Sequence, residues 1–334
     1  MAVPAPNYAS HVDYADLGPL VPDEVAADVI KTLPQSSAAV KLLRTVRMSA
    51  RTLTQPVLAS LPVAYWVNGS TGLKQTTELS WDGVTLTAEE IAVIVPIPDV
   101  VIDDAGFPIW AEVRPLIAEA IGLKLDQAVF SGIDSPASWP DGIIPQAIAA
   151  GNTSAVDSTP AEGGLANDLL GAFDPVEADG YDVTGIAADR SIKSGLRKAR
   201  DTTGQKIIDV STGEIEGVPI EYVGFNVFDP ATSGGTVAVV GDFNMAILGI
   251  RQDITYKLLD QAVISDDAGK VILNLAQQDA QALRVVARFG FAKAKPVTRS
   301  DSATPYPFAV LQDAGGAGAM RSSSRRASAK ASNE

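Results

Sequence analysis

Apolar residues recur with helical spacing along one stretch of the chain, between Asp103 and Gly142. At 100° per residue they fall in one broad sector, which is the pattern of a long helix with one buried face. Lys124 is the one charged residue in that sector, and its long stem can carry the ammonium group out to solvent. The apolar positions are Val113, Leu116, Ile117, Ala120, Ile121 and Ala128.

The ends of this helix are indicated by caps and helix breakers. Asp103 or Asp104 can cap the start, and Pro108 suits a first turn. Pro115 predicts either a kink or a later start, because proline cannot donate a backbone hydrogen bond. Gly132 is expected to end the helix, and the turn after it is rich in proline and glycine.

Three carboxylates occupy the side of the helix opposite its apolar face. Glu112, Glu119 and Asp126 recur every seven residues, so an ideal helix places them in one nearly axial stripe. Such a stripe is usually a solvated face. The alternative is a surface that meets basic side chains of a neighbouring subunit, and these three residues are therefore candidates for a subunit interface.

Between Ser49 and Val101 the apolar pattern changes to period two, which predicts strands. Asp82-Gly83 is expected to form a tight turn within a hairpin. The expected strands are 63–67 (VAYWV), 77–81 (TELSW), 84–86 (VTL) and 91–97 (IAVIVPI).

This hairpin carries more apolar surface than two strands can bury. Trp66 and Trp81 are the largest of its apolar side chains, and a two-stranded hairpin is marginal in water by itself. The hairpin must therefore lie on another surface, either of its own domain or of a neighbouring subunit.

Helical and strand patterns alternate in the following part of the chain, which predicts a small α/β unit. Residues 143–164 are rich in small residues, proline and glycine and are expected to form a loop or boundary. The second helix carries Arg190, Lys193, Arg197, Lys198 and Arg200, and a solvated or subunit-facing surface is expected there. The expected elements are helix 165–173, strand 181–188, helix 189–200 and strands 206–210 and 218–223.

Strands dominate again from Thr236, and the two ends of the chain lack strong patterns. A strand, a Gly-Asp turn and a second strand are followed by an alternating segment from Val271 and a strand from Val285 to Ala294. Short helices are expected over 22–33 and 38–46, after an extended arm. The chain beyond Thr298 is rich in serine, alanine and glycine, is locally basic at its end, and is expected to be disordered.

Composition excludes several kinds of chemistry. The chain has 334 residues, no cysteine and a single histidine, His11, so thiol chemistry is impossible and Ser-His catalysis lacks a plausible base. A net charge of −14 argues against binding nucleic acid through a basic patch. Neither a signal peptide nor an apolar run of 18 residues occurs, so a soluble protein made in the cytoplasm is expected. No phosphate-binding loop, dinucleotide fingerprint or calcium loop appears, and no cofactor or metal is expected.

One segment also carries a family resemblance. A long helix ending in LDQAVFSG, then a short Ser/Pro turn and PDGI, resembles the spine helix and following turn of tailed-phage major capsid proteins. The resemblance implies an α+β chain with the Hong Kong phage-type capsid fold. The parts it implies are an N-terminal arm over 1–48, an extended β-hairpin loop over 49–101, a peripheral domain with the spine helix over 102–142, an axial domain over 143–240, a return to the peripheral domain over 241–298 and a C-terminal tail over 299–334.

The resemblance implies a structural protein and not an enzyme. Such proteins assemble as pentamers and hexamers into an icosahedral shell that encloses double-stranded DNA. The implied partners are further copies of the chain, a scaffolding protein, a portal and a decoration protein, with no membrane, and the implied location is the virion after assembly in the host cytoplasm. Two alternatives stay open: an encapsulin-type shell filled with cargo enzyme, and a carboxylate-dependent hydrolase that would be a small oligomer with turnover.

Some members of this family join subunits by an isopeptide bond between a loop lysine and an asparagine, aided by a glutamate. Lys74 and Asn274 are the residues that could correspond here. The acid near Asn274 is Asp279, and no glutamate occurs between Glu221 and Glu334. Crosslinking is therefore not expected, although Lys74 remains a candidate for the subunit interface.

Overall fold

The structure is a computed structural model that describes residues 37–64, 66, 76–77, 79–105, 108–159, 163–200, 205, 213–228, 234–266, 268–300 and 304–313. The chain divides into two compact units. The first unit comprises Met1–Ser36, Glu90–Ile121 and Gln252–Arg288, and the second comprises Ser37–Glu89, Gly122–Arg251 and Phe289–Glu334.

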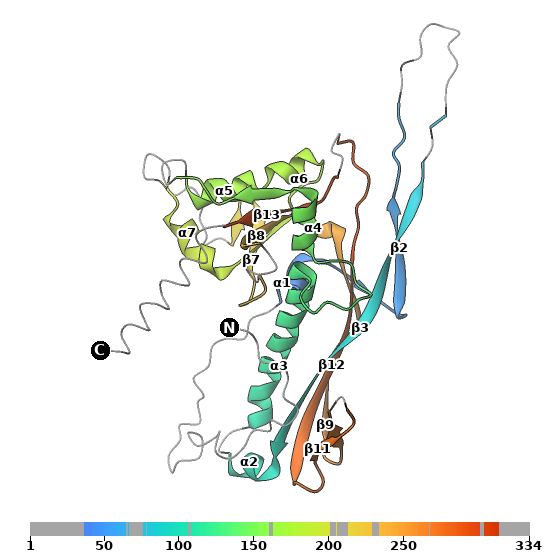
Figure 1. The fold of residues 1–334 in the computed structure, drawn as a ribbon, viewed down its shortest axis with the longest axis vertical. Helices are drawn as coiled ribbons and strands as arrows, with labels where there is room; N and C mark the ends of the chain where they lie inside the picture. Colours follow the sequence, from blue (N-terminus) through green and yellow to red (C-terminus); the bar gives the residue numbers. More distant parts are fainter. Residues whose placement is uncertain are drawn as a thin grey trace. The chain divides into compact units, whose positions relative to one another are not determined.

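The second unit contains a six-stranded sheet with the order β4-β13-β8-β5-β7-β6 (Figure 1). Every residue of β5 and β8 is buried, as expected for central strands covered on both faces. β13 pairs in parallel with β4 and antiparallel with β8. The strands are Thr153–Ala155 (β4), Gly185–Ala188 (β5), Glu214–Ile215 (β6), Val218–Tyr222 (β7), Thr236–Gly241 (β8) and Phe308–Gln312 (β13).

Three short helices pack on one face of this sheet (Figure 1). They are α5 (Leu165–Gly171), α6 (Asp174–Ala178) and α7 (Lys193–Lys198), the last preceded by a 3-10 turn at Arg190–Ile192. Alternate strand residues join the helices in one apolar cluster, because successive side chains of a strand point to opposite faces. The cluster includes Leu169, Val176, Ile186, Leu196, Val240 and Leu311.

Aromatic side chains fill the space on the opposite face. The Phe243 ring lies 5.3 Å from that of Phe308 and 6.4 Å from that of Phe130, measured between centroids. Phe130 also contacts Phe228, edge to face, at 5.9 Å. Helix α1 (Ala38–Leu42) contacts β5 and β7, and α4 (Ile143–Ala150) contacts β13. The edge-to-face geometry adds to the stabilisation that burial of these rings provides.

A five-stranded sheet with the order β1-β9-β12-β3-β2 contains three long strands. These are β3 (Trp81–Pro98), β9 (Ala246–Leu259) and β12 (Ala280–Lys293), and each has residues in both units. Strand β1 (Arg44–Arg47) pairs in parallel with β9. Strand β2 (Thr52–Leu58) pairs antiparallel with β3 (Figure 1).

The expected hairpin exists, but its strands and turn differ from the expectation. Asp82 and Gly83 do not form a turn, because β3 runs through them and Gly83 pairs with Pro56 of β2. Residues 61–64 and 66 belong to no strand. The strand that pairs with β3 is 52–58. Because this segment contains threonines and a proline, its apolar pattern is weaker than that of the segment around Trp66.

In its described residues, the first unit contains parts of the three long strands, most of a long helix, a short helix and a small hairpin. Helix α2 is Asp99–Asp104, and β10 (Val263–Ser265) pairs with β11 (Val271–Asn274). Leu273, Leu275, Ala280 and Ala282 form its apolar cluster. The guanidinium group of Arg288 donates to Glu90 Oε2 from Nε at 2.9 Å and from Nη2 at 2.6 Å.

The spine helix α3 spans Ile109–Asp126 and continues as a π-helix over Gln127–Ser131. Gly132 ends it with φ of 71°, as expected, and close approach also requires glycine at 142, where an added Cβ would lie 2.5 Å from the Gly132 nitrogen. Pro115 lies inside the helix and does not delay its start. The expected capping by Asp103 or Asp104 is wrong, because both residues belong to the separate helix α2.

The apolar face of α3 is only partly buried. Ile117, Ile121 and Ala128 are buried as expected, whereas Leu116 is 49% exposed and Ala120 is exposed. The buried side is extended instead by Leu125. The sequence periodicity predicts the apolar sector of the helix. Which residues of that sector are buried depends on the elements that pack against it.

Two further expectations are wrong in this part of the chain. The segment after Gly142 is not all loop, because α4 and β4 lie within it. The chain beyond Thr298 is not simply disordered, because Phe308–Gln312 forms β13 inside the six-stranded sheet. The expected strand 206–210 and the expected helix 22–33 lie outside the described residues.

Candidate assembly surfaces

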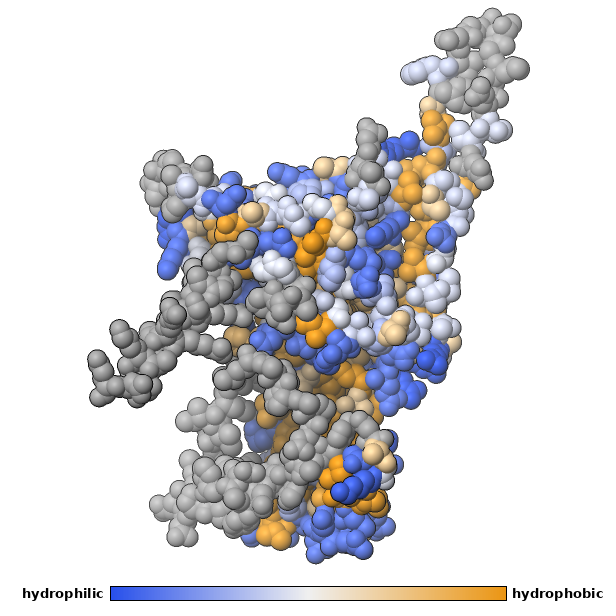
Figure 2. All heavy atoms as spheres, viewed as in Figure 1, coloured by the Kyte–Doolittle hydropathy of each residue, from blue (hydrophilic) through white to orange (hydrophobic). Residues whose placement is uncertain are grey.

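The hairpin of β2 and β3 exposes large apolar side chains. Trp66 is 97% exposed and Trp81 is 66% exposed, and Val63 and Leu79 are also exposed. Figure 2 shows hydrophobic residues at the surface along this hairpin. Isolated exposed apolar residues are ordinary, but several on one hairpin are typical of a contact surface.

The base of the same hairpin is firmly held within the second unit. Leu86 and Ala88 of β3 are buried in an apolar cluster with Met48 and Ile247. The indole nitrogen of Trp139 donates to the Thr87 carbonyl at 3.0 Å. The hairpin is therefore anchored at Leu86 and Ala88, while Trp81 on the same strand remains available to a partner.

Glu89 ties the hairpin to the loop after the spine helix. Its Oε1 accepts a hydrogen bond from the Ser138 hydroxyl at 2.9 Å. The same oxygen forms an ion pair with Arg51 Nη2 at 3.3 Å. The Ser138 hydroxyl lowers the pKa of Glu89, with help from Arg51 and against the opposing effect of burial. These contacts join the base of the hairpin to the loop after the spine helix.

The carboxylate stripe of the spine helix does not exist as a stripe of three. Glu112 and Glu119 are half-buried, whereas Asp126 is 1% exposed and lies within the protein. The expectation that Asp126 faces solvent or a neighbour is wrong, because residues 37–39 cover it. Glu112 and Glu119 remain candidates for a subunit interface.

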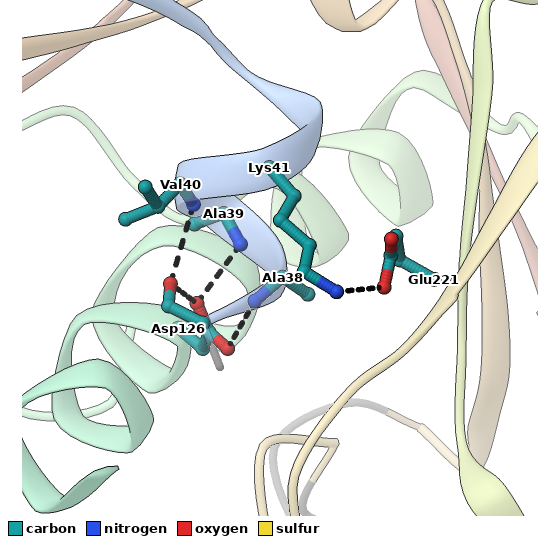
Figure 3. A network of polar contacts seen from close by, with 7 residues as sticks. Ala38, Ala39, Val40, Lys41, Asp126 and Glu221 are labelled. Carbon is teal, nitrogen blue, oxygen red and sulfur yellow. Dashed lines mark hydrogen bonds and ion pairs between the residues drawn. The ribbon is translucent and has the colours of Figure 1, made fainter. Parts of the chain in front are cut away.

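Asp126 holds the start of α1 (Figure 3). Its carboxylate accepts from Ser37 Oγ at 2.5 Å, from the Ala38 nitrogen at 2.9 Å and from the Ala39 nitrogen at 3.0 Å. These backbone N–H groups have no partner inside α1, so a carboxylate at this helix end satisfies them and complements the helix dipole. Asp126 is thus a tertiary cap that joins the spine helix to the segment preceding β1.

Two neighbouring contacts support this cap. The Ser37 hydroxyl also accepts from the Val40 nitrogen at 3.2 Å, and the Lys41 ammonium pairs with Glu221 of β7 at 2.8 Å (Figure 3). Burial raises the pKa of Asp126, and the hydrogen bonds from Ser37, Ala39 and Ala38 oppose that rise only in part.

Lys293, at the end of β12, is a buried cation that the sequence pattern did not single out. It is 8% exposed, and its ammonium donates to the carbonyl oxygens of Asp141 and, at 3.1 Å, Gly142. Burial, together with the neighbouring Lys295, lowers the pKa of Lys293 to about 7, although Asp141 opposes the shift. The position of Lys293 directly after the apolar run FGFA was the available signal for a buried amine.

The residues considered for crosslinking are only partly described. Lys74 lies outside the described residues, so its position stays a prediction. Asn274 ends β11, and its carbonyl accepts from the nitrogens of Gln277 and Gln278, each at 3.1 Å. Asp279 has φ of 44°, and its carbonyl accepts from the Asp99 nitrogen.

Among the described residues, no group of three or more histidine or acidic side chains is arranged to hold a metal ion. No described helix is both long and apolar enough to span a membrane.

The sequence matches the Phage capsid family over residues 18–297. It is 26% identical over 296 residues to the major capsid protein of Staphylococcus phage 80alpha, which covers 85% of this chain and 87% of that protein.

Solved structures from several phages resemble the whole described fold. A chain from Microbacterium phage Oxtober96 is 39% identical with a TM-score of 0.75, and covers 91% of this chain and 100% of that chain. A chain from Mycobacterium phage Cain is 32% identical with a TM-score of 0.76, and covers 91% of this chain and 99% of that chain. The likeness therefore extends over nearly the full length on both sides.

Proposed function

The chain belongs to the phage capsid family and is a major capsid protein, and we propose that its copies assemble as pentamers and hexamers into a closed icosahedral shell around double-stranded DNA. The family match confirms the resemblance to tailed-phage capsid proteins, and the structural matches confirm the α+β fold of the Hong Kong phage type. An encapsulin-type compartment is not favoured, because the matching family is that of phage capsids and the relatives named above are phage proteins.

The exposed hairpin is the observation that supports assembly most directly. Its base is anchored at Leu86 in the apolar cluster, while Trp81 and Trp66 are exposed in the single chain. Exposed aromatic groups on an anchored strand can bury large apolar areas against another copy, and such residues often dominate interface energies. The proposed cover is a neighbouring subunit, with Lys74 carried on the same loop.

The shell interior is proposed to hold DNA without reading its sequence. The chain carries 26 basic against 40 acidic residues, so a strongly attractive lining of phosphate contacts is not expected. Scaffolding, portal and decoration proteins are the further partners proposed, with assembly in the host cytoplasm before the shell becomes part of the virion. The arm over 1–48 and the axial and peripheral assignments belong to the same proposal.

Electron microscopy of the full-length chain, expressed alone and with a scaffolding protein, tests this function. Closed shells of uniform diameter with five-fold and six-fold capsomers are expected, and particles from infected cells should contain DNA. A monodisperse monomer at micromolar concentration under both conditions would contradict the proposal. Shells filled with a cargo enzyme and free of DNA would instead identify a cellular compartment.

A further inference from the structure

Helix α7 and the 3-10 turn before it present several exposed cations. Arg190, Arg197 and Lys198 are exposed, and none of them forms an ion pair within the described part of the chain. Lys193 and Arg200 differ, since the Lys193 ammonium lies 4.5 Å from the centroid of the Tyr222 ring and Arg200 donates to the carbonyls of Arg197 and Ala199. We call Arg190, Arg197 and Lys198 the basic patch.

Helix α6 presents the opposite charge. Asp174 and Glu177 are both exposed, and neither forms an ion pair with another described residue. Asp179, which follows the helix, is buried and bonded to Asn152 and the Tyr306 nitrogen, so it does not contribute to the surface. We call Asp174 and Glu177 the acidic patch.

The two patches lie on the same face of the six-stranded sheet but over different strands. Residues of both helices belong to the one apolar cluster on that face, with α6 contacting β13 and Lys193 of α7 contacting Tyr222 of β7. Strands β8 and β5 separate β13 from β7, and three strand spacings amount to roughly 14 Å. This distance explains why no ion pair joins the patches within the subunit.

We propose that the acidic patch of one copy meets the basic patch of the next copy around a capsomer. This interface rests on the proposed function, because it needs several copies in a ring. A ring of identical subunits joins two different surfaces of each subunit head to tail, and complementary charge at those surfaces sets the register of neighbours. In a chain of net charge −14, unpaired cations gathered on one helix also offset the repulsion between copies.

Charge reversal with rescue tests this interface. The variant Arg197→Glu/Lys198→Glu and the variant Asp174→Lys/Glu177→Lys should each lower shell yield about tenfold or more, because each brings like charges together at every contact. Combining all four changes in one chain restores opposite charges across each contact, and shell yield should return to within about twofold of the original. Sedimentation and electron microscopy of the full-length protein provide the yield.

Controls separate charge pairing from folding and from net charge. Thermal unfolding of the unassembled subunits should change only modestly, because these side chains are exposed and their reversal opposes only the dipoles of two short helices, in the first turn of α6 and the last turn of α7. Lys257→Glu/Lys270→Glu is the control for the basic patch. It makes the same change in net charge as Arg197→Glu/Lys198→Glu, at exposed residues outside the six-stranded sheet, and its shell yield should stay close to that of the original chain.

The outcomes distinguish this proposal from its rivals. Normal shells from either reversed variant, or reversed variants that the combination does not rescue, overturn the charge-paired interface. Shells that form normally but lack DNA only when the basic patch is reversed would show that this patch contacts nucleic acid instead. If the original chain forms no shell under any condition, the proposed function itself fails.

Discussion

At the scale of single residues, two buried ionisable groups connect parts of the chain that lie far apart in sequence. Asp126 accepts three hydrogen bonds from residues 37–39, and Lys293 donates to the carbonyls of residues 141 and 142. Each group carries the desolvation cost of burial, so its hydrogen-bond partners determine whether the charge is tolerated.

Asp126→Ala should destabilise the isolated subunit. Ser37 Oγ and the nitrogens of Ala38 and Ala39 would lose their common acceptor in a buried place, which costs about 1 to 3 kcal/mol. Chemical unfolding of the subunit measures the change. Asp134→Asn is the control, because it removes the charge from the exposed ion pair with Lys124 while asparagine tolerates the φ of 49° at this position, and it should cost less than about 1 kcal/mol. Equal losses of unfolding free energy would show that the buried hydrogen bonds of Asp126 stabilise the subunit no more than an exposed ion pair does.

Lys293→Met should remove a pH dependence of stability. The pKa of Lys293 is lowered to about 7 in the folded state, while an unfolded lysine keeps its usual value of about 10.4. Between these values the unfolded chain binds the extra proton, so the unfolding free energy should rise as pH increases from 7 to 9. The methionine variant should lose this rise, and Lys270→Met, at an exposed residue, should retain it. If the unfolding free energy changed with pH in the same way for all three proteins, the lowered pKa of Lys293 would be contradicted.

At the scale of elements, the same strand serves both the core and the surface. Strand β3 buries Leu86 completely, five residues after Trp81, which is 66% exposed. In the six-stranded sheet, the short apolar run Phe308–Leu311 within the Ser/Ala/Gly-rich end of the chain supplies most of an inner strand, β13.

Trp81→Ala should reduce assembly more than it reduces subunit stability. A buried aromatic at an interface can contribute about 2 kcal/mol or more, whereas little burial is lost in the single chain. Leu86→Ala on the same strand is the matched control and should lower the unfolding free energy by about 2 to 5 kcal/mol. Calorimetry of unassembled protein and shell yield by sedimentation give the two readings. If Trp81→Ala unfolds the subunit as strongly as Leu86→Ala does, the tryptophan belongs to the subunit core.

A chain that ends at Thr298 should fail to fold its second unit. Removing β13 deprives β4 and β8 of their shared neighbour and exposes the faces that Phe308 and Leu311 cover. A chain that ends at Asp313 keeps this strand and should unfold at nearly the same temperature as the full chain. Circular dichroism and thermal unfolding compare the two truncations. Cooperative unfolding of the shorter chain at the normal temperature would contradict the role of β13.

At the scale of the whole molecule, assembly is expected to depend on non-covalent surfaces. In the proposed assembly, the hairpin provides apolar area and the charged patches of α6 and α7 set the register between copies. The sequence near Asn274 offers Asp279 and no glutamate.

Shells should therefore dissolve to single chains when boiled in detergent. Without the glutamate that aids isopeptide formation, Lys74 should remain a free amine. Denaturing gel electrophoresis of purified shells measures this, and Lys74→Arg shells should give the same single band. A ladder of linked subunits that disappears in Lys74→Arg would show that Lys74 forms a covalent link between subunits, contrary to this prediction.

Local patterns in the sequence were sufficient to predict those features that depend on near neighbours in the chain. The 3.6-residue period between Val113 and Ala128 predicted the spine helix, and Gly132 predicted its end because few other residues adopt the left-handed conformation there. Period-two segments likewise predicted β3, β9 and β12 in outline. The resemblance to capsid proteins depended on the order of these elements and on LDQAVFSG.

Only the tertiary structure decided which side chains are covered and which segments pair. Asp126 and Glu119 look alike in the helical pattern, but Ser37 to Ala39 pack against Asp126 and bury it. Gly83 resembles a turn residue, yet its pairing with Pro56 keeps it inside a strand. The short segment Phe308–Gln312 becomes an inner strand because β4 and β8 satisfy its backbone hydrogen bonds on both sides. Burial and strand pairing depend on contacts between residues far apart in sequence, and no local pattern contains that information.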